Sequence, residues 1–243
     1  MTYPKFKNKH LYEALFGPKD SAKYRVRPKN IPHKYILVYS DSALNYIKKK
    51  YKPKATNIFD SFTINICKGV GFVQIIGIGS PTASFILEGL IALGGRKFIN
   101  IGTAGGLISE GVFLCIKALR DEGTSYHYIP HGHYSYPNKE LTRKLGEAMK
   151  KQGINYKTGI TWTIDAPYRE TKKEIEHYSR IGVATVEMEA SALFAVAQYR
   201  KVKITAAFVV SDILGKKWEP KFHKLDVKKT LNKLIDSAVD CLS

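Results

Sequence analysis

The stretch GIGSPTASFILEGLIALGGRKFINIGTAGGL, residues 77–107, decides the fold of this chain. It follows the apolar run Phe72–Ile76, and a glycine turn leads into apolar residues at helical spacing. We expect Ser80 to be the N-cap of a helix and Pro81 to occupy its first position, and the glycine pair 94–95 should end it. A β-branched run and a second glycine cluster come next. This order of strand, helix and strand predicts a mixed or parallel sheet covered by helices.

The rest of the chain continues the alternation of strand-like runs and helical patterns. No repeat, low-complexity tract or linker divides it, so we expect one α/β domain over residues 1–243. The expected helices lie between Asn138 and Gly153, from near Glu187 through Arg200, and over Leu225–Leu242. The expected strands are Tyr35–Tyr39, Phe62–Cys67, Phe72–Ile76, Phe98–Ile101, Val112–Lys117, Lys157–Thr161, Val183–Val186 and Ile204–Val210.

The composition excludes several classes of protein. A hydrophobic fraction of 44% is ordinary for a globular chain. No apolar run approaches the roughly 18 residues of a membrane span, and the basic N-terminus lacks the apolar run of a signal peptide. We therefore expect a cytoplasmic protein without a membrane partner. The cysteines lack zinc-ligand spacing, so we expect no metal site and interpret each as a small buried hydrophobe: Cys67, Cys115 and Cys241.

The net charge of +18, from 39 Lys and Arg against 21 Asp and Glu, is high for a compact domain. It could reflect a solvated surface, attraction of anionic substrates, or nucleic-acid binding. Positive residues are scattered in short groups such as Lys48–Lys50 and Lys228–Lys229. No helix-turn-helix, zinc-finger or RNP pattern accompanies them. The sequence therefore favours a solvated surface and disfavours nucleic acid as a partner.

Two glycine clusters each follow a strand-like run. Gly77-Ile78-Gly79 opens a helix, so its N–H groups could face an anion, although a tight turn explains these glycines equally well. A dinucleotide-binding fingerprint requires a third glycine where the chain has Thr82. The second cluster, residues 100–106, adds the hydroxyl of Thr103. We expect the clusters to lie side by side at the carboxyl ends of adjacent parallel strands, where open α/β sheets bind ligands.

Carboxylates mark two further places. In the stretch VEMEAS, Glu187 and Glu189 would point apart on a helix but would share a face in an extended lead-in. Acidic residues near a helix N-terminus also stabilise the helix dipole, which is a simpler explanation. Asp212 follows Ser211 at the end of an apolar strand, so it is either a general acid or a turn residue.

Together these stretches resemble one protein family. Residues 77–107, VEMEASALFAVA at 186–197 and VVSD at 209–212 are similar to the trimeric and hexameric nucleoside phosphorylases, which include purine nucleoside and uridine phosphorylases. The resemblance implies a single-domain three-layer α/β/α sandwich with a mixed, partly barrel-like central sheet. It also implies a cytoplasmic hexamer, built as a trimer of dimers, whose active site is shared between subunits. No cofactor is implied, only inorganic phosphate as co-substrate.

The activity implied is phosphate-dependent cleavage of a nucleoside to free base and pentose 1-phosphate, with purines favoured and uridine possible. The implied catalytic residues are Glu189, which would accept hydrogen bonds from ribose hydroxyls, and Asp212, which would protonate the leaving purine. The other implied contacts are Glu187, Met188 and His10 at ribose, the last lent to a neighbouring subunit, then Gly102 and Thr103 at phosphate, and Tyr168, Arg169 and Ser211 at the base.

The chain departs from the family at the phosphate site. Three positions where the family has arginines hold Asn100, Leu44 and Ile58, and the basic residues that could replace them include Arg25, Arg27 and Arg169. Asn100 also resembles the related hydrolytic nucleosidases, which use water. The segment Asp121–Tyr128 resembles the uridine enzymes instead. A nucleosidase therefore stays an alternative, as does a non-catalytic nucleoside- or nucleic-acid-binding protein on the same fold.

Overall fold

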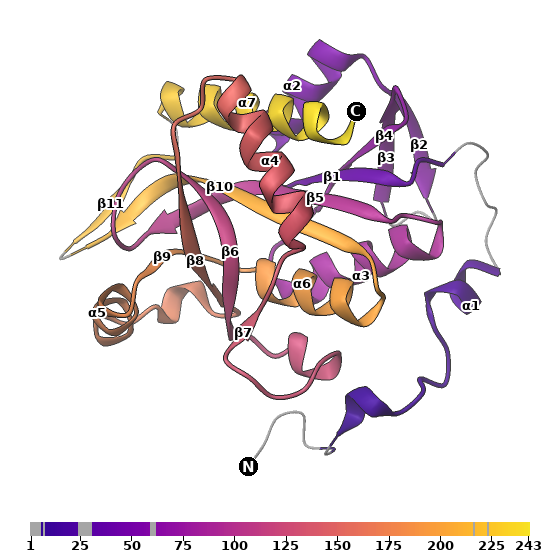
Figure 1. The fold of residues 1–243 in the computed structure, drawn as a ribbon, viewed down its shortest axis with the longest axis horizontal. Helices are drawn as coiled ribbons and strands as arrows, with labels where there is room; N and C mark the ends of the chain where they lie inside the picture. Colours follow the sequence, from indigo (N-terminus) through magenta and orange to yellow (C-terminus); the bar gives the residue numbers. More distant parts are fainter. Residues whose placement is uncertain (1–5, 7, 24–30, 59–61, 216, 223) are drawn as a thin grey trace.

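A mixed β-sheet forms the centre of the molecule (Figure 1). The computed structural model describes residues 1–243 except 1–5, 7, 24–30, 59–61, 216 and 223. The strands are β1 (Lys34–Val38), β2 (Lys54–Ile58), β3 (Phe62–Cys67), β4 (Val70–Gln74), β5 (Lys97–Gly106), β6 (Val112–Asp121), β7 (Tyr134–Ser135), β8 (Tyr156–Ile164), β9 (Val183–Glu187), β10 (Lys203–Leu214) and β11 (Trp218–Pro220). They lie in the order β11-β10-β6-β8-β9-β5-β1-β4-β3-β2, with β7 beside β6.

Part of this sheet closes on itself. Because β10 also pairs with β5, strands β5, β10, β6, β8 and β9 form a ring. Within the ring β10 runs parallel to β5 but antiparallel to β6. Outside it, β5 continues through the parallel strand β1 into β4, β3 and β2. The mixed, partly barrel-like sheet is therefore confirmed, and β5 is the strand that the ring and its extension share.

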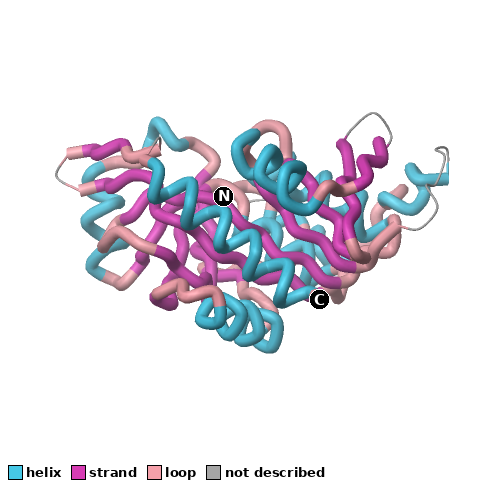
Figure 2. The backbone as a smooth tube through the Cα atoms, turned by 90° about the horizontal axis from the view of Figure 1, so that it is seen from above, coloured by secondary structure: helices cyan, strands magenta, loops and turns pink. Residues whose placement is uncertain are grey.

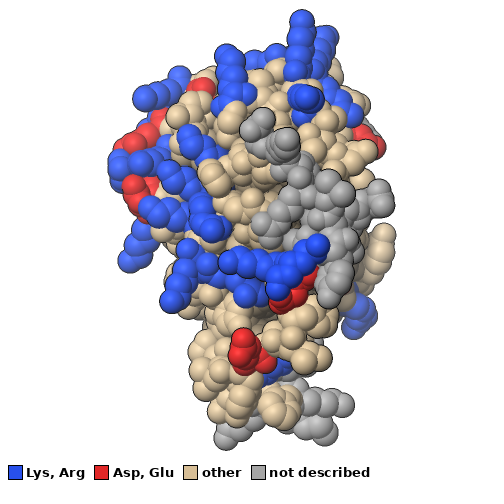
Figure 3. Space-filling view, turned by 90° about the vertical axis from the view of Figure 1, so that its right-hand side faces the viewer, with Lys and Arg blue, Asp and Glu red and all other residues tan. Residues whose placement is uncertain are grey.

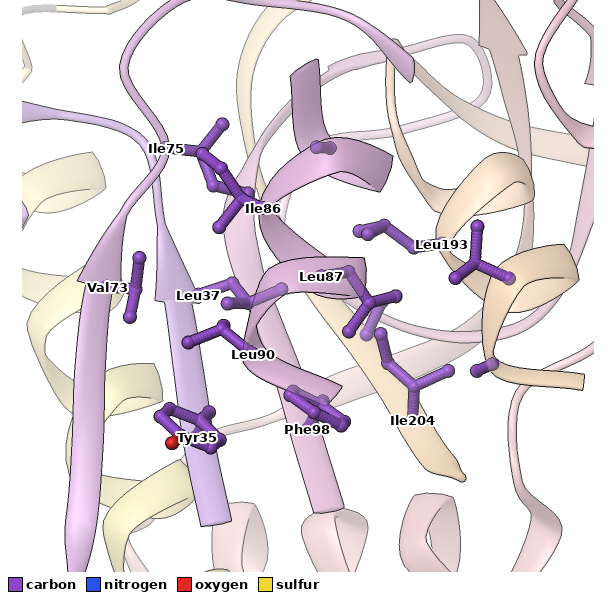
Figure 4. Close-up of a cluster of buried hydrophobic side chains, with 14 of the residues drawn as sticks. Tyr35, Leu37, Val73, Ile75, Ile86, Leu87, Leu90, Phe98, Leu193 and Ile204 are labelled. Carbon is purple, nitrogen blue, oxygen red and sulfur yellow. The ribbon is translucent and has the colours of Figure 1, made fainter. Parts of the chain in front are cut away.

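Helices cover both faces of the sheet, which confirms the three layers. They are α1 (Pro18–Lys23), α2 (Asp41–Tyr51), α3 (Ser80–Ala92), α4 (Lys139–Lys151), α5 (Lys172–Arg180), α6 (Ala190–Tyr199) and α7 (Leu225–Leu242), with short 3-10 turns η1 (Lys9–Leu11), η2 (Ser125–His127) and η3 (Pro167–Arg169). One apolar core lies under α2, α4 and α7, and Figure 2 shows α7 lying lengthwise over the sheet. A second core lies under α3 and α6, and Figure 4 shows side chains of α3 meeting those of β1 and β4 there.

Helix α3 ends as the sequence predicts but begins differently. Gly94 has a φ of 107°, and the N–H of Gly95 bonds back to the helix, so this pair ends it. The N-cap, however, is Gly79, whose φ of 95° suits glycine, and Ser80 is the first helical residue. The prediction of Ser80 as N-cap is wrong because its hydroxyl donates to Met188 O at 2.8 Å instead.

The second glycine cluster lies inside a strand rather than after one. Residues 102–106 continue β5 because they pair with β10, and the last two also pair with β9. Strands β4 and β5 are not neighbours either, since β1 lies between them and runs parallel to both. The two glycine clusters therefore share one edge of the sheet, but the prediction that their strands are adjacent is wrong.

The other expected elements are present, with some ends shifted. Asn138 caps α4 by accepting the N–H of Leu141 at 2.9 Å, and α7 has the expected bounds. The sequence analysis did not anticipate α2, α5, β2 or β11. Of the three free cysteines only Cys115 is buried, so the interpretation of the other two as buried hydrophobes is wrong. Among the described helices, none is long and apolar enough to cross a membrane.

The basic residues are spread over the surface and do not gather at one site. Figure 3 shows Lys and Arg side chains in several separate groups over one face of the molecule. The group Lys48–Lys50 forms the last turn of α2, where positive charge is favourable next to the unpaired carbonyl groups of a helix end. This placement fits the interpretation of a solvated surface.

Candidate functional site

The junction between β9 and α6 places two carboxylates together. Glu187 is the last residue of β9, and Glu189 is the N-cap of α6, so the prediction that the helix begins near Glu187 is wrong. Pairing with β8 keeps Glu187 in the strand, opposite Thr163. Its Oε2 accepts the N–H groups of Glu189 at 2.9 Å and Ala190 at 2.7 Å, and its Oε1 accepts the hydroxyl of Thr163 at 2.5 Å. Glu187 thus satisfies the first free N–H groups of α6.

The glycine turn before α3 holds the second carboxylate. The N–H of Gly79 donates to Glu189 Oε1 at 2.8 Å, and Ser80 Oγ donates to the carbonyl of Met188 at 2.8 Å. The positive φ of Gly79 lets its N–H turn toward the carboxylate. The first glycine cluster therefore positions Glu189 and Met188, in addition to starting a helix.

Both carboxylates are buried, and this changes their protonation. Glu187 is 7% exposed and Glu189 is 8% exposed. Burial, and after it the charge of Glu189, raises the pKa of Glu187 to about 8. Burial also raises the pKa of Glu189. Among the described residues, no lysine or arginine contributes appreciably to the pKa of either carboxylate. The pair therefore holds a proton at neutral pH.

Asp212 lies across β5 from this pair. In the sheet Asp212 of β10 is opposite Gly105 of β5, and Gly105 is opposite Val186 of β9. A Cβ atom at Gly105 would lie 3.5 Å from Asp212 Oδ2 and 3.0 Å from Val186 Cγ1. The absence of a side chain at Gly105 therefore lets β9 and β10 approach, and it brings the end of β9 close to Asp212.

The carboxylate of Asp212 is held by two donors. Ser211 Oγ donates to its Oδ1 at 2.9 Å, as the sequence resemblance implies for this pair, and Trp218 Nε1 donates to its Oδ2 at 2.9 Å. Trp218 lies on β11, a short strand that folds back on β10. The sequence analysis missed Trp218 because it carried no motif, although it is one of only two tryptophans in the chain.

The 3-10 turn η3 lies beside Asp212. The partly buried Glu170 follows this turn, and burial, then the charge of Asp212, raises the pKa of Glu170 to about 7. Glu170 was missed, although it directly follows two residues that the resemblance singles out. Of these, Arg169 is exposed and the Tyr168 side chain is 99% exposed. The turn carrying Tyr168 therefore borders the site, but its ring points into solvent.

The expected phosphate residues Gly102 and Thr103 lie on β5, as does Asn100, which the resemblance places where the family has an arginine. Thr103 is exposed, and Gly102 leaves room for the ring of Tyr39, which comes within 3.4 Å of the Cβ position of that glycine. Tyr39 Oη donates to Asn100 Oδ1 at 2.8 Å. Asn100 is fully buried, and its Nδ2 has no hydrogen-bond partner among the described residues. Burial, then the charges of Glu189 and Glu187, raises the pKa of Tyr39, so its ring lies near the carboxylate pair.

Tyr39 was missed by the sequence analysis, although it ends the first expected strand at the edge where the site lies. The structure does not bring every predicted residue to that edge. His10 lies on η1, which contacts η2 rather than the start of α6. Leu44 is in the first turns of α2 and Ile58 ends β2. Arg25 and Arg27 lie outside the described residues.

A separate cavity lies between the N-terminal segment and α3. It has a volume of about 520 Å³ and is lined by aromatic side chains, among them Tyr12, Phe16 and Phe85. None of the carboxylates at the β9–α6 junction lines it. In the part of the chain that the structure describes, no group of three or more His, Cys, Asp or Glu side chains could hold a metal ion.

The candidate site thus lies where β5, β9 and β10 end and where α3 and α6 begin. It brings together the expected ribose residues Glu187, Met188 and Glu189 and, across Gly105, the expected acid Asp212. Buried carboxylates can accept hydrogen bonds from sugar hydroxyls, and a carboxyl group at a strand end can transfer a proton.

Comparisons with known proteins identify the family of the chain and similar folds. Residues 36–242 match the family model described as "Phosphorylase superfamily". Uridine phosphorylase of Haemophilus influenzae is 28% identical over 181 residues, which are 67% of this chain and 71% of that protein. The structure is similar to that of AMP nucleosidase from Bacteroides thetaiotaomicron, with a TM-score of 0.77, 23% identity, and coverage of 94% of this chain and 99% of the other. It is also similar to purine nucleoside phosphorylase from Toxoplasma gondii in complex with immucillin-H, with a TM-score of 0.77, 21% identity, and coverage of 89% and 93%.

Proposed function

We propose that this chain, which belongs to the phosphorylase superfamily, cleaves the N-glycosidic bond of a nucleoside. The products would be a free base and a pentose 1-phosphate, which makes the protein a pentosyltransferase with inorganic phosphate as co-substrate. One observation carries the proposal: Asp212 is opposite Gly105 of β5, and Gly105 is opposite Val186, the residue before Glu187 and the start of α6.

The carboxylate pair would hold the sugar. Cleavage passes through a sugar with oxocarbenium character, so the ribose must be fixed while its bond to the base breaks. Glu189 accepts the N–H of Gly79 with one oxygen, which leaves the other for the ribose 2′- and 3′-hydroxyls. Glu187, protonated at neutral pH, lies behind it, and Met188 packs under the sugar. In the assembled enzyme, His10 of a neighbouring subunit would complete the ribose site.

Asp212 would protonate the leaving base. Its carboxyl group is 8% exposed and is oriented by Ser211 and Trp218. A proton on Asp212 suits N7 of a purine, which gains electron density as the bond breaks. Purines are therefore the favoured substrates, with uridine as the second choice. Tyr168 and Arg169 are proposed to contact the base from the neighbouring turn.

The nucleophile decides between two candidate functions. Phosphate would bind at Gly102 and Thr103, where the exposed Thr103 can offer its hydroxyl as a donor. Hydrolysis by water is the second candidate, and the neutral Tyr39–Asn100 pair at the position of a family arginine favours it. Each charge-assisted hydrogen bond from a missing arginine would contribute on the order of 1.5–3 kcal/mol to anion binding.

The test is base release from inosine, adenosine and uridine with and without phosphate, together with identification of the sugar product. Ribose 1-phosphate formed only with phosphate is the expected result. Base release that does not depend on phosphate and yields free ribose would show that the enzyme hydrolyses the nucleoside instead. Absence of any turnover would refute the enzymatic function. The variant Asp212→Asn should slow purine cleavage far more than it weakens nucleoside binding.

A second copy of the chain is proposed to cover the face around the aromatic cavity, as part of a hexamer with shared active sites. Large apolar side chains are exposed on and before α3, including Ile76, Ile78 and Phe85, which are 75%, 68% and 62% exposed. Such surface usually marks an interface between proteins. Light scattering coupled to gel filtration should give the mass of a hexamer, and a monomer would refute this. We place the enzyme in the cytoplasm, where the three free cysteines would stay reduced.

A further inference from the structure

A buried chain of polar groups connects the β9–α6 junction to the loop after β6. Glu122, 5% exposed, lies in this loop, and its Oε1 accepts the hydroxyl of Ser191 at 2.7 Å. Ser191 is the second residue of α6, and its N–H donates to Thr163 Oγ1 at 3.0 Å. Thr163 Oγ1 in turn donates to Glu187 Oε1 at 2.5 Å. Two fully buried residues, Ser191 through its hydroxyl and backbone N–H and Thr163 through its hydroxyl, therefore join Glu122 to the carboxylate pair.

The other side of Glu122 is anchored as well. Its Oε2 accepts the N–H groups of Thr124 at 2.6 Å and Ser125 at 2.9 Å. Ser125 Oγ accepts Arg120 Nε at 2.8 Å, and Arg120 is 5% exposed. The buried negative charge of Glu122 thus lies near a buried positive charge, which offsets part of its desolvation cost.

The sheet sets the spacing of this network. Arg120 of β6 is opposite Thr163 of β8, and Thr163 is opposite Glu187 of β9. Neighbours in register place their side chains on the same face of a sheet. The loop that carries Glu122 and the first turn of α6 are therefore fixed to one row of residues, and that row ends at the site.

We infer that Glu122 is a positioning residue for the carboxylates of the site. Through Ser191 it holds the first turn of α6, and this turn sets where Glu187 and Glu189 face the sugar. The inference rests on the proposed function, because it assigns these carboxylates to the substrate. Glu122 itself is separated from the site by Ser191 and Thr163, and both of its oxygens already accept hydrogen bonds from the protein.

The test compares variants with a matched control. Glu122→Ala leaves the hydroxyl of Ser191 without its acceptor and should lower kcat/KM by about 100-fold, since small misplacements in an active site have effects of this size. Both kcat and KM should change. Glu122→Gln should restore activity to within about threefold of wild type, because its oxygen can accept the two loop N–H groups while its amide donates to Ser191. The control Ser84→Ala, on α3, removes a buried hydroxyl that has no hydrogen-bond partner in the described part of the chain, and activity should not change.

Hydrogen exchange provides a readout that does not depend on turnover. In Glu122→Ala and in Ser191→Ala, the amides of Glu189, Ala190 and Ser191 should exchange at least about tenfold faster, because the first turn of α6 opens more often. The double variant should be no worse than Glu122→Ala alone, because that variant has already lost the bond to Ser191. Unchanged exchange at these amides, or wild-type kcat/KM in Glu122→Ala, would overturn the inference. If wild-type protein cleaves no nucleoside, the proposed function fails, and the exchange experiment alone decides the positioning role.

Discussion

Replacing Gly105 by alanine tests whether β5, β9 and β10 must meet closely for the site to exist. A Cβ atom there would lie 2.3 Å from Leu214 Cδ1, 3.0 Å from Val186 Cγ1 and 3.5 Å from Asp212 Oδ2. The methyl group of Leu214 can rotate away because it is the end of a flexible side chain. Val186 is β-branched and sits in the paired strand β9, so it cannot. The strands must therefore separate by a few tenths of an ångström.

Overpacking of this kind costs about 1–3 kcal/mol of the free energy of unfolding. The effect on activity should be larger, because the displaced Val186 precedes Glu187 directly and Asp212 lies on the opposite side. We expect kcat/KM to fall on the order of 10–100-fold. Urea unfolding measures the first quantity and base release from a purine nucleoside measures the second.

The matched control is Gly215→Ala, just beyond the end of β10. A Cβ atom there would meet its nearest neighbours at 3.9 Å, so neither stability nor activity should change. If Gly105→Ala were fully active per folded molecule, the separation of the two carboxylate regions would not matter. The reasoning that joins Asp212 to Glu187 in one site would then be refuted.

Three further predictions concern buried charges. In the wild type, the free energy of unfolding should fall as the pH rises from 4.5 to about 8, because folded Glu187 keeps a proton that the unfolded chain has lost. In Glu187→Gln this fall should be smaller. Urea titrations at each pH should show a slope smaller by up to about 1.4 kcal/mol per pH unit, and an unchanged slope would contradict the raised pKa. Glu88→Gln breaks a bidentate pair with Arg200 at 2.8 Å and should cost about 2 kcal/mol in urea unfolding; equal stability would show that the pair contributes nothing. Asp236→Asn weakens the acceptor of two tyrosine hydroxyls between α2 and α7, so its Tm should drop, with a loss of about 1–3 kcal/mol, whereas an unchanged Tm would mean that these bonds are replaced by water.

Local signals in the sequence identified the elements whose ends depend on neighbouring residues in the chain. The glycine pair 94–95 ends α3, and Asn138 caps α4, because turn and cap preferences act over a few residues. The bounds of α7 followed from its apolar periodicity. These predictions needed no knowledge of what packs where.

Elements fixed by distant partners could not be predicted in the same way. A cluster of glycines has low strand propensity, yet residues 102–106 are strand because β10 and β9 supply hydrogen bonds from elsewhere in the sequence. Glutamates favour helix, yet Glu187 is strand because β8 pairs with it. In both cases tertiary pairing decided the conformation against local propensity.

The residues of the candidate site fall into the same two groups, those predicted from the sequence and those brought in by distant strands. Glu187, Glu189 and Asp212 were predicted because they stand near the ends of expected strands and because the resemblance to the nucleoside phosphorylases implied their roles. The residues that hold or border them came from other parts of the chain: Tyr39 from β1, Trp218 from β11 and Glu122 from the loop after β6. Their roles arise from sheet register, which a single sequence does not specify.

The protonation of the carboxylate pair bears directly on the choice between phosphate and water. Phosphate would bring negative charge to a site where burial raises the pKa of both Glu187 and Glu189, and where the charge of Glu189 raises the pKa of Glu187 further. A further anion would raise these pKa values again, so phosphate binding would favour the protonated form of the pair. The neutral Tyr39–Asn100 pair supplies hydrogen bonds but no cation. Water has no comparable effect, because it enters the site without charge. The two candidate nucleophiles thus differ in the protonation of the carboxylate pair that they favour.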